Sequence, residues 1–501
     1  MMRRFHMKTK NICGLLLLSA ILLCACGNDD TATTETASDT QAVETETESL
    51  FESDDLPEDL DFSGQSVTWY VGDYNNAYWD DFYAENTNGE RINDAIYRSR
   101  NSLEERLNVT LEYYRKEVIY ANRHDISSDI STSVMAGDNA YDVYSGYDLS
   151  VMTVQGEFFH NLNDGKYLNF DKPWWNKSML GMLPGDKVYT ALGDGSLSLI
   201  KHTFCLYFNQ DKLASFGIEE NPYDLVDSGK WTLDKMYELI NNTYVDLNGN
   251  GVSDYGDNYG LTMGDVNKYI GWHFSLGGEM VQLTDDGYVL SAGSEHMVNV
   301  VGKLATFLRE NLNVKIPIID AKNSEDHAPS TGGNYVDKTF IEGNALFTAC
   351  LVGDAVALLE DINFEYGMVP YPKYDEAQSN YISAVQRFAS FSVPITADLD
   401  LSSAVIEAWS SEAYRTIQPE YFETVLKSRY SADNQMADMF DLIRATIRFD
   451  ISDLFCDSLN ELSCEPALLI RDDKGGQWAS HYASKEKKWN KALEEIWDAL
   501  S

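Results

Sequence analysis

The pattern of apolar and polar positions predicts alternating strands and helices from about residue 62 onward. Apolar residues recur at helical spacing through 90–107, where Ile92, Ile96 and Leu103 are separated by charged side chains. The expected elements are strands over 67–71, 109–114 and 141–144, with helices over 90–107 and 125–136 between them. This order predicts a parallel sheet with right-handed crossovers.

A second block with the same alternation begins after residue 203. Its expected strands lie at 206–208, 259–261, 347–351, 366–369 and 390–393, and its expected helices at 232–240, 295–310, 402–413, 419–427, 435–447 and 485–500. Two similar blocks indicate an α/β protein with two lobes. Ligands of parallel sheets bind beyond the carboxyl ends of the strands, which places the expected site at loops 72–80 and 145–150.

The N-terminal segment has the pattern of an export signal. Residues 1–11 are basic and polar, and residues 12–23 are largely apolar but too few to span a bilayer. The following residues, Leu23-Cys24-Ala25-Cys26, resemble the lipobox of bacterial lipoproteins, in which the last cysteine is acylated. Cys26 fits this role because the small Ala25 precedes it, and we expect cleavage after residue 25. An ordinary cleaved signal is the alternative.

Acidic residues dominate the next segment and the chain as a whole. Residues 27–61 contain no Lys or Arg and many Asp, Glu, Thr and Ser, so 26–61 is expected to be a disordered tether. The full chain has 38 Lys and Arg against 80 Asp and Glu, a formal net charge of -42. Such a surface repels phosphate backbones, so a nucleic-acid partner is excluded.

Five stretches follow one another along the chain at 136–143 (AGDNAYDV), 206–213 (LYFNQDKL), 229–236 (GKWTLDKM), 340–347 (FIEGNALF) and 366–373 (YGMVPYPK). In this order they resemble segments of the extracellular solute-binding proteins of ABC importers, in the carbohydrate-type branch. The resemblance implies the two-lobed type II fold of the periplasmic binding proteins, each lobe a mainly parallel sheet flanked by helices, with a hinge and a ligand cleft between. Transferred to this chain, it places lobe one at 62–203 plus 390–445 and lobe two at 204–389 plus 446–501.

The resemblance also implies a function without catalysis. The expected protein is a monomeric receptor, lipid-anchored on the outer face of the cell membrane of a Gram-positive cell. It would capture a sugar or oligosaccharide and deliver it to ABC permease subunits. No nucleophile elbow, P-loop or His-Glu-x-x-His motif is present. A surface glycoside hydrolase or lyase, or a receptor of the same fold for a peptide or another small solute, remains an alternative.

Aromatic and polar residues near the expected strand ends are the candidate ligand contacts. Sugar rings stack on aromatic faces, and their hydroxyl groups need carboxylate, amide or guanidinium partners. The candidates are Tyr74, Trp79, Tyr147, Asp148, Trp272 and Arg387. Burial in a lobe core is the alternative for each of them, as it is for the Trp174-Trp175 pair.

One loop has the spacing of a calcium site. In 246–257 oxygen ligands recur as in an EF-hand loop, with Gly251 at the sharp turn and a backbone carbonyl at the seventh position. The expected ligands are Asp246, Asn248, Asn250, Val252, Asp254 and Asp257. The final Asp replaces the usual Glu, so a structural calcium of low affinity is expected, and a metal-free turn is the alternative.

Cysteines are few. An exported compartment permits a Cys456–Cys464 bridge, while buried free thiols are the alternative for these residues and for Cys205 and Cys350.

Overall fold

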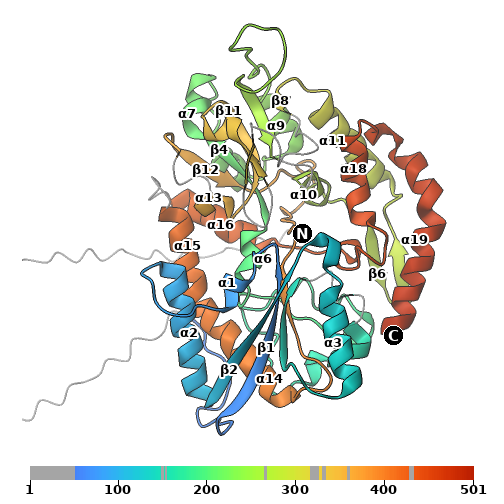
Figure 1. The fold of residues 1–501 in the computed structure, drawn as a ribbon. Helices are drawn as coiled ribbons and strands as arrows, with labels where there is room; N and C mark the ends of the chain where they lie inside the picture. The colour runs from blue at the N-terminus through green and yellow to red at the C-terminus, as the bar shows by residue number, and fades with distance from the viewer. Residues whose placement is uncertain are drawn as a thin grey trace, which may run out of the picture. The chain divides into compact units, whose positions relative to one another are not determined.

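The computed structural model describes residues 51–147, 152, 155–264, 268–315, 327–329, 335–357, 362–427 and 434–501. Cys26 and Asp148 therefore lie outside the described residues, as do the signal segment and 27–50 of the expected tether. Two larger sheets organise the described part of the chain (Figure 1).

The first sheet has the strand order β13-β3-β1-β2. Its strands are β1 (Gln65–Tyr74), β2 (Val109–Val118), β3 (Val143–Tyr147) and β13 (Ala389–Ser392). β1 pairs in parallel with both β2 and β3, while β13 joins β3 antiparallel. The expectation of a mainly parallel sheet is therefore confirmed here, and Tyr74 is the last residue of β1 instead of a loop residue.

The second sheet has the order β12-β4-β11-β5-β8 and is mixed. Its strands are β4 (Phe204–Asn209), β5 (Tyr259–Met263), β8 (Val314–Lys315), β11 (Ala345–Leu351) and β12 (Tyr366–Val369). β4 runs antiparallel to both of its neighbours, so the expectation of a mainly parallel sheet is wrong for this half. Two hairpins complete the strands: β6 (Val281–Thr284) with β7 (Gly287–Leu290), and β9 (His327–Pro329) with β10 (Tyr335–Asp337).

Helices fill connections between these strands, and α14 to α19 follow the last strand, β13. The α-helices are α1 (Trp79–Phe82), α2 (Arg91–Leu107), α3 (Asp125–Ala136), α5 (Gln155–Phe158), α6 (Leu197–Lys201), α7 (Gln210–Ser215), α8 (Pro222–Asp227), α9 (Leu233–Leu239), α10 (Lys268–Ser275), α11 (Glu295–Arg309), α12 (Lys338–Ile341), α13 (Asp354–Ala357), α14 (Leu399–Glu412), α15 (Gln418–Lys427), α16 (Asn434–Ala445), α17 (Ile451–Leu454), α18 (Glu465–Arg471) and α19 (Trp478–Leu500). Shorter turns are the 3₁₀ elements η1 (Tyr120–Asn122), η2 (Leu162–Asp164), η3 (Pro184–Asp186), η7 (Leu462–Cys464) and η8 (Gly475–Gln477), and the π-helical η6 (Ala413–Ile417). Within the described ranges, no helix combines the length and apolar character that crossing a membrane requires.

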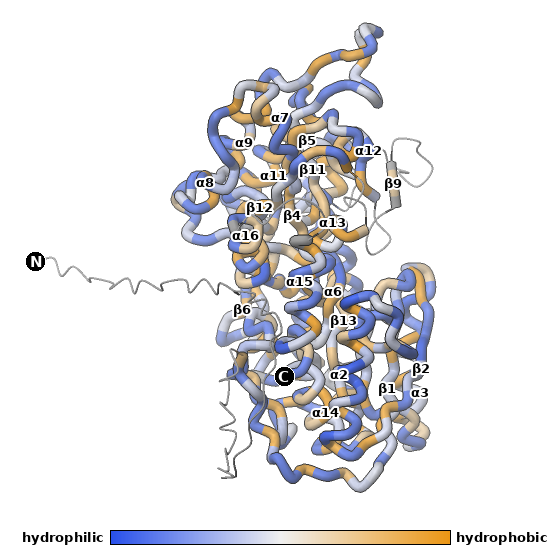
Figure 2. The backbone as a smooth tube through the Cα atoms, turned by 90° about the vertical axis from the view of Figure 1, so that its left-hand side faces the viewer, coloured by the Kyte–Doolittle hydropathy of each residue, from blue (hydrophilic) through white to orange (hydrophobic). Residues whose placement is uncertain are grey.

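Helices cover both faces of the first sheet. Successive residues of β1 point to opposite faces, so neighbouring residues of this strand contact different helices. The Trp69 ring lies 5.6 Å from that of Trp409 in α14, while the Tyr70 hydroxyl donates to Asp129 of α3 at 3.0 Å. α2 buries its apolar stripe and leaves charged residues outside, as the alternation of colours along its tube in Figure 2 illustrates. Strands buried on both faces read as continuous apolar runs, which is why the sequence pattern locates them.

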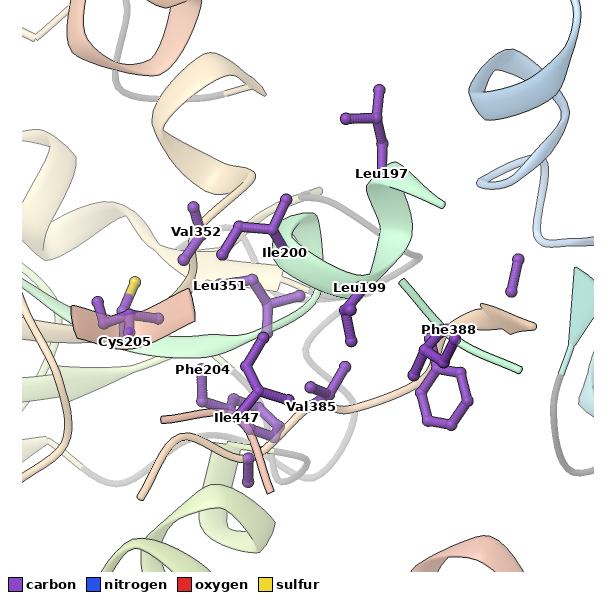
Figure 3. Close-up of a cluster of buried hydrophobic side chains, with 14 of the residues drawn as sticks. Leu197, Leu199, Ile200, Phe204, Cys205, Leu351, Val352, Val385, Phe388 and Ile447 are labelled. Atoms are coloured by element: carbon purple, nitrogen blue, oxygen red, sulfur yellow. The ribbon is translucent and has the colours of Figure 1, made fainter. Parts of the chain in front are cut away.

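Three chain segments cross between the two sheets side by side. Thr203 forms a bridge with Val385, and Ser383 forms one with Ile447. Apolar side chains from α6, β4 and β11 pack around these crossings, as Figure 3 shows for Ile200, Phe204 and Leu351. The crossings agree with the two-lobed fold. The lobe boundaries given above stay predictions, and α16, assigned above to lobe one, packs against β12 of the second sheet.

The predicted C-terminal boundary of the tether, at residue 61, is wrong. Residues 51–61 are part of the folded unit, because distant cations neutralise their charges. Both terminal nitrogens of Arg106 donate to the buried carboxylate of Asp54, at 2.8 and 2.6 Å, and Leu56 is buried. Lys172 adds an ion pair with Asp55 at 2.7 Å. The acidic composition of residues 51–61 did not reveal these partners, because Arg106 and Lys172 lie far away in the sequence.

Candidate ligand-binding site

A buried carboxylate shapes the chain just after β1. Asp73 accepts hydrogen bonds from the backbone N–H groups of Tyr78 and Trp79, at 2.9 and 3.2 Å. Its other oxygen accepts two bonds from the guanidinium of Arg115, at 2.8 and 2.5 Å. The Arg115 guanidinium also lies over the Trp79 ring, 5.3 Å from its centre. This carboxylate therefore fixes the position of the loop and orients Trp79, which is half-buried.

Three of the predicted ligand contacts meet at the carboxyl ends of β1 and β3. The rings of Tyr74 and Tyr147 stack with centroids 4.3 Å apart and planes inclined by 13°. Arg387 donates to the Tyr74 hydroxyl at 2.5 Å, and its guanidinium lies 5.0 Å from the centre of that ring. Tyr120 lies on another side of this guanidinium, at 5.6 Å. Parallel pairing of β1 with β3 brings Tyr74 and Tyr147 to the same edge of the sheet.

An ion pair between a buried carboxylate and a half-buried ammonium group ties α1, which follows this loop, to the first crossing segment. Asp81 accepts from the Lys201 ammonium at 2.9 Å and from the backbone N–H of Ser198 at 2.7 Å. Burial raises the pKa of Asp81, and the Lys201 charge opposes that shift. His202 directly follows Lys201. Burial, and to a smaller extent the Lys201 charge, lowers the pKa of His202 to about 3, so its imidazole is neutral at pH 7. The Nδ1 atom of His202 lies 2.8 Å from the Arg387 carbonyl oxygen, which connects the ion pair to the tyrosine cluster.

A cavity of about 480 Å³ opens beside this ion pair. Asp80, Tyr83, Asn88 and Glu90 line it from the first-sheet side. The rest of its wall comes from Ile92 and Asn93 of α2, Leu197 and Lys201 of α6, the segment Gly353–Ala357 after β11, and Tyr421 of α15. The volume lies in the range of small-ligand sites, and the carboxylates, amides and two phenol rings of this lining suit a ligand rich in hydroxyl groups.

Trp272, another of the predicted ligand contacts, does not join this group. Trp272 lies on α10 without exposed surface, and its ring packs 4.5 Å from that of Tyr371 and 5.6 Å from that of Phe307. It is therefore a core residue of the second-sheet half in this structure. Trp174 and Trp175 are also buried, which confirms the burial alternative for that pair.

Sequence reasoning missed a set of polar contacts between the segment after β2 and the segment after α17. Arg123 donates two hydrogen bonds to Asp457, at 3.0 and 2.9 Å, and the Tyr120 hydroxyl donates to Glu461 at 2.7 Å. The partners are more than 300 residues apart, so no local spacing could have revealed them.

The predicted calcium loop is held by its own hydrogen bonds. Asp246 accepts from the backbone N–H groups of Gly249 and Gly251, at 2.7 and 2.8 Å, and Gly251 has the positive φ of 74° that such a turn favours. Asp254 accepts from the side-chain amides of Asn248 and Asn250, at 2.9 and 2.6 Å. In the part of the chain that the structure describes, no three or more His, Cys, Asp or Glu side chains converge as a metal site. The calcium stays a prediction.

No protein-family model and no curated protein sequence matches the chain. Solved structures do match it. The chain has the fold of the solute-binding proteins of ABC transporters, which confirms the fold that the sequence motifs imply. The galacto-N-biose/lacto-N-biose I-binding protein of the ABC transporter from Bifidobacterium longum, in complex with lacto-N-biose, matches with a TM-score of 0.55 at 10% identity, over 87% of this chain and 98% of that chain.

Two further structures match almost as well. One is the maltose/maltodextrin-binding domain from Bdellovibrio bacteriovorus bound to maltotriose, with a TM-score of 0.51 at 11% identity over 84% of this chain and 100% of that chain. The other is the cyclic alpha-maltosyl-1,6-maltose binding protein from Arthrobacter globiformis, with a TM-score of 0.51 at 13% identity over 87% and 99%. At these identities the likeness concerns the fold.

Proposed function

We propose that this protein is the sugar receptor of an ABC importer, which binds an oligosaccharide without breaking a bond in it. The observation that supports this most is the cavity of about 480 Å³ between the loop after β1 and the segment after β11, in a chain with this fold. The matching structures described above are themselves binding proteins, each bound to a sugar or named for one.

In this proposal both halves of the protein contact the ligand. The Tyr83 ring offers an apolar face to a sugar, while Asp80, Asn88 and Glu90 accept or donate hydrogen bonds to its hydroxyl groups. Contacts with Gly353–Ala357 come from the other half, so they form fully only when the halves approach each other. A ligand that gains these contacts favours the closed arrangement, which is the form that the permease would recognise.

We further propose that the protein is anchored outside the cell. Processing before Cys26 and acylation of that residue would hold the chain on the membrane, with the acidic segment as a spacer. A Cys26→Ser variant should then leave the membrane fraction and appear in the medium; retention on the membrane would contradict the anchor.

The loop at 246–257 is proposed as a weak structural calcium site. Calcium should raise the melting temperature of the full chain at millimolar concentrations, and an Asp246→Asn variant should lose that rise. An equal rise in both proteins would exclude the loop as the site.

Titration calorimetry with a panel of oligosaccharides tests the receptor function. We expect saturable heat for at least one glycan, and a Tyr83→Ala variant should weaken that binding roughly tenfold because it removes one stacking surface. Tyr237→Ala is the matched control, since Tyr237 is an exposed residue of α9 that does not line the cavity.

The same titrations separate the receptor from the enzyme alternative. Chromatography of each mixture should recover the glycan intact. Absence of binding by every glycan would contradict the sugar ligand, and release of shorter products would indicate a hydrolase or lyase.

A further inference from the structure

The four cysteines of the described chain form two pairs in very different surroundings. Cys205 of β4 and Cys350 of β11 face each other across antiparallel strands, and neither has exposed surface. Burial raises the pKa of both thiols well above its ordinary value. A thiol that is both protonated and inaccessible reacts slowly with any oxidant.

The second pair, Cys456 and Cys464, is brought together by a tight turn. Asn460 and Glu461 adopt positive φ angles of 54° and 60°, which fold the chain back on itself. The backbone N–H of Glu461 donates to the Cys456 carbonyl at 2.8 Å, and that of Cys464 donates to the Glu461 carbonyl at 2.9 Å. The Ser463 hydroxyl lies 3.6 Å from the Cys456 sulfur atom and 3.9 Å from the Cys464 sulfur atom, so one side chain contacts both thiols.

The two thiols of this pair are not equivalent. The hydrogen bond from Cys456 lowers the pKa of Cys464, and the positive charge of Arg387 acts in the same direction. The reverse contact and burial raise the pKa of Cys456. Burial of the Cys464 thiol opposes the lowering of its own pKa. As residues, Cys456 is 7% exposed and Cys464 is half-buried. The direction of the pKa shift and the greater exposure of the residue both favour Cys464 as the attacking thiol.

We propose that Cys456 and Cys464 are a redox-active thiol pair that small-molecule disulfides convert to an intramolecular disulfide, with Cys464 as the attacking residue. The Cys464 thiolate attacks one sulfur of the disulfide RS–SR and releases RS⁻, which leaves a mixed disulfide on Cys464. Cys456 then loses its proton and attacks the Cys464 sulfur, which forms the Cys456–Cys464 bond and releases the second RS⁻. Two protein thiols are oxidised, and one small disulfide is reduced to two thiols.

The position of the pair gives this reaction a structural consequence. The turn between the two cysteines carries Asp457 and Glu461, which hold Arg123 and Tyr120 of the segment after β2. Closing the disulfide would fix this turn and with it the contact between the two segments. This inference does not depend on the sugar ligand, so the two proposals can fail separately.

The test uses the reduced full chain and glutathione disulfide, followed by alkylation of the remaining thiols and peptide mass mapping. We expect the peptides of Cys456 and Cys464 to be recovered as one disulfide-linked species, while Cys205 and Cys350 are alkylated only after unfolding. A Cys456→Ser variant should accumulate the glutathione adduct on Cys464, because the resolving thiol is missing. A Cys464→Ser variant should leave Cys456 unmodified.

A Cys205→Ser variant is the matched control and should form the Cys456–Cys464 disulfide in the same yield as the wild type. Recovery of Cys456 and Cys464 as free thiols under these conditions would overturn the proposal. So would a Cys205–Cys350 disulfide as the main product, or equal glutathione adducts on Cys456 and Cys464 in the two single variants. The wild-type map decides the question even where a variant folds poorly.

Discussion

At the scale of single residues, Glu407 of α14 shows how burial changes acid–base chemistry. Its side chain has no exposed surface and accepts a hydrogen bond from the Trp175 indole at 3.1 Å. Burial raises the pKa of Glu407 to about 8, with the hydrogen bonds acting in the opposite direction. The folded protein therefore keeps this carboxyl group protonated at pH values where the unfolded chain would release the proton.

This shift predicts a pH dependence of stability that one substitution removes. Between pH 4.5 and about 8 Glu407 binds more protons in the folded state than in the unfolded state, so its contribution to the free energy of unfolding falls as pH rises through this window. Glu407→Gln keeps an oxygen acceptor for Trp175 without a titrating proton. The melting temperatures of both proteins are measured from pH 5 to 8.5. We expect the melting temperature of the variant to rise relative to that of the wild type as pH rises. The total change in this difference corresponds to a few kcal/mol of unfolding free energy.

Comparing the Glu407→Gln variant with the wild type separates the contribution of Glu407 from that of the histidines. The pKa values of His202 and His273 are lowered to about 3 by burial, which makes stability rise with pH below about 6.5. Both proteins share this contribution, so it cancels. A constant difference between variant and wild type across the window would contradict the raised pKa of Glu407.

Residue roles were only partly predictable from the sequence. Tyr74, Tyr147 and Arg387 lie together at the strand ends that the sequence located, but both tyrosines are buried and none of the three lines the cavity. Trp272 was misplaced because a local motif does not reveal which face of a short helix packs inward. The partners Asp457 and Glu461 could not be found, since tertiary packing alone brings them to Arg123 and Tyr120.

At the scale of elements, a pair of glycines sets how closely β1 and β3 approach at the site. Gly72 and Gly146 are register partners, and a Cβ atom on Gly146 would lie 2.5 to 2.6 Å from backbone atoms of Gly72. The next residue of β3 belongs to the tyrosine cluster, since Tyr147 follows Gly146 directly. The stacking of Tyr74 on Tyr147 therefore depends on the absence of a side chain at Gly146.

We predict that Gly146→Ala destabilises the protein by about 3 kcal/mol, because backbone atoms cannot move away as a side chain can. Gly302→Ala is the matched control: Gly302 lies in α11, and no atom lies within 4 Å of the place that an added methyl group would take, so this change should stabilise by about 0.5 to 1 kcal/mol. Thermal unfolding measures both. A melting temperature for Gly146→Ala equal to that of the wild type would contradict the close approach.

The positions of helices and strands were predicted best from the sequence. The pairing of the strands was predicted less well. The helices at 91–107, 125–136 and 295–309 follow from the spacing of their apolar residues. The antiparallel direction of β4 did not follow from any pattern, because a strand buried on both faces reads the same in either direction. The folding of 51–61 was missed because Arg106 and Lys172, which neutralise it, are distant in sequence.

At the scale of the whole molecule, two sheets are joined by three crossing segments, and one cavity is lined by polar side chains of the first half and by the segment Gly353–Ala357 of the second. Such an arrangement converts ligand contacts into a preference for one relative position of the halves, and needs no catalytic group to do so. The Asp81–Lys201 ion pair and the neutral His202 lie where the first crossing meets the site.

Hydrogen–deuterium exchange, with and without the tightest-binding glycan, tests the central claim most directly. We predict slower exchange in residues 72–83 after β1 and, at the same glycan concentration, in residues 351–357 after β11, because a ligand held between the halves protects both. Protection of one of these segments alone, or of neither with any glycan that binds, would contradict a ligand gripped from both sides.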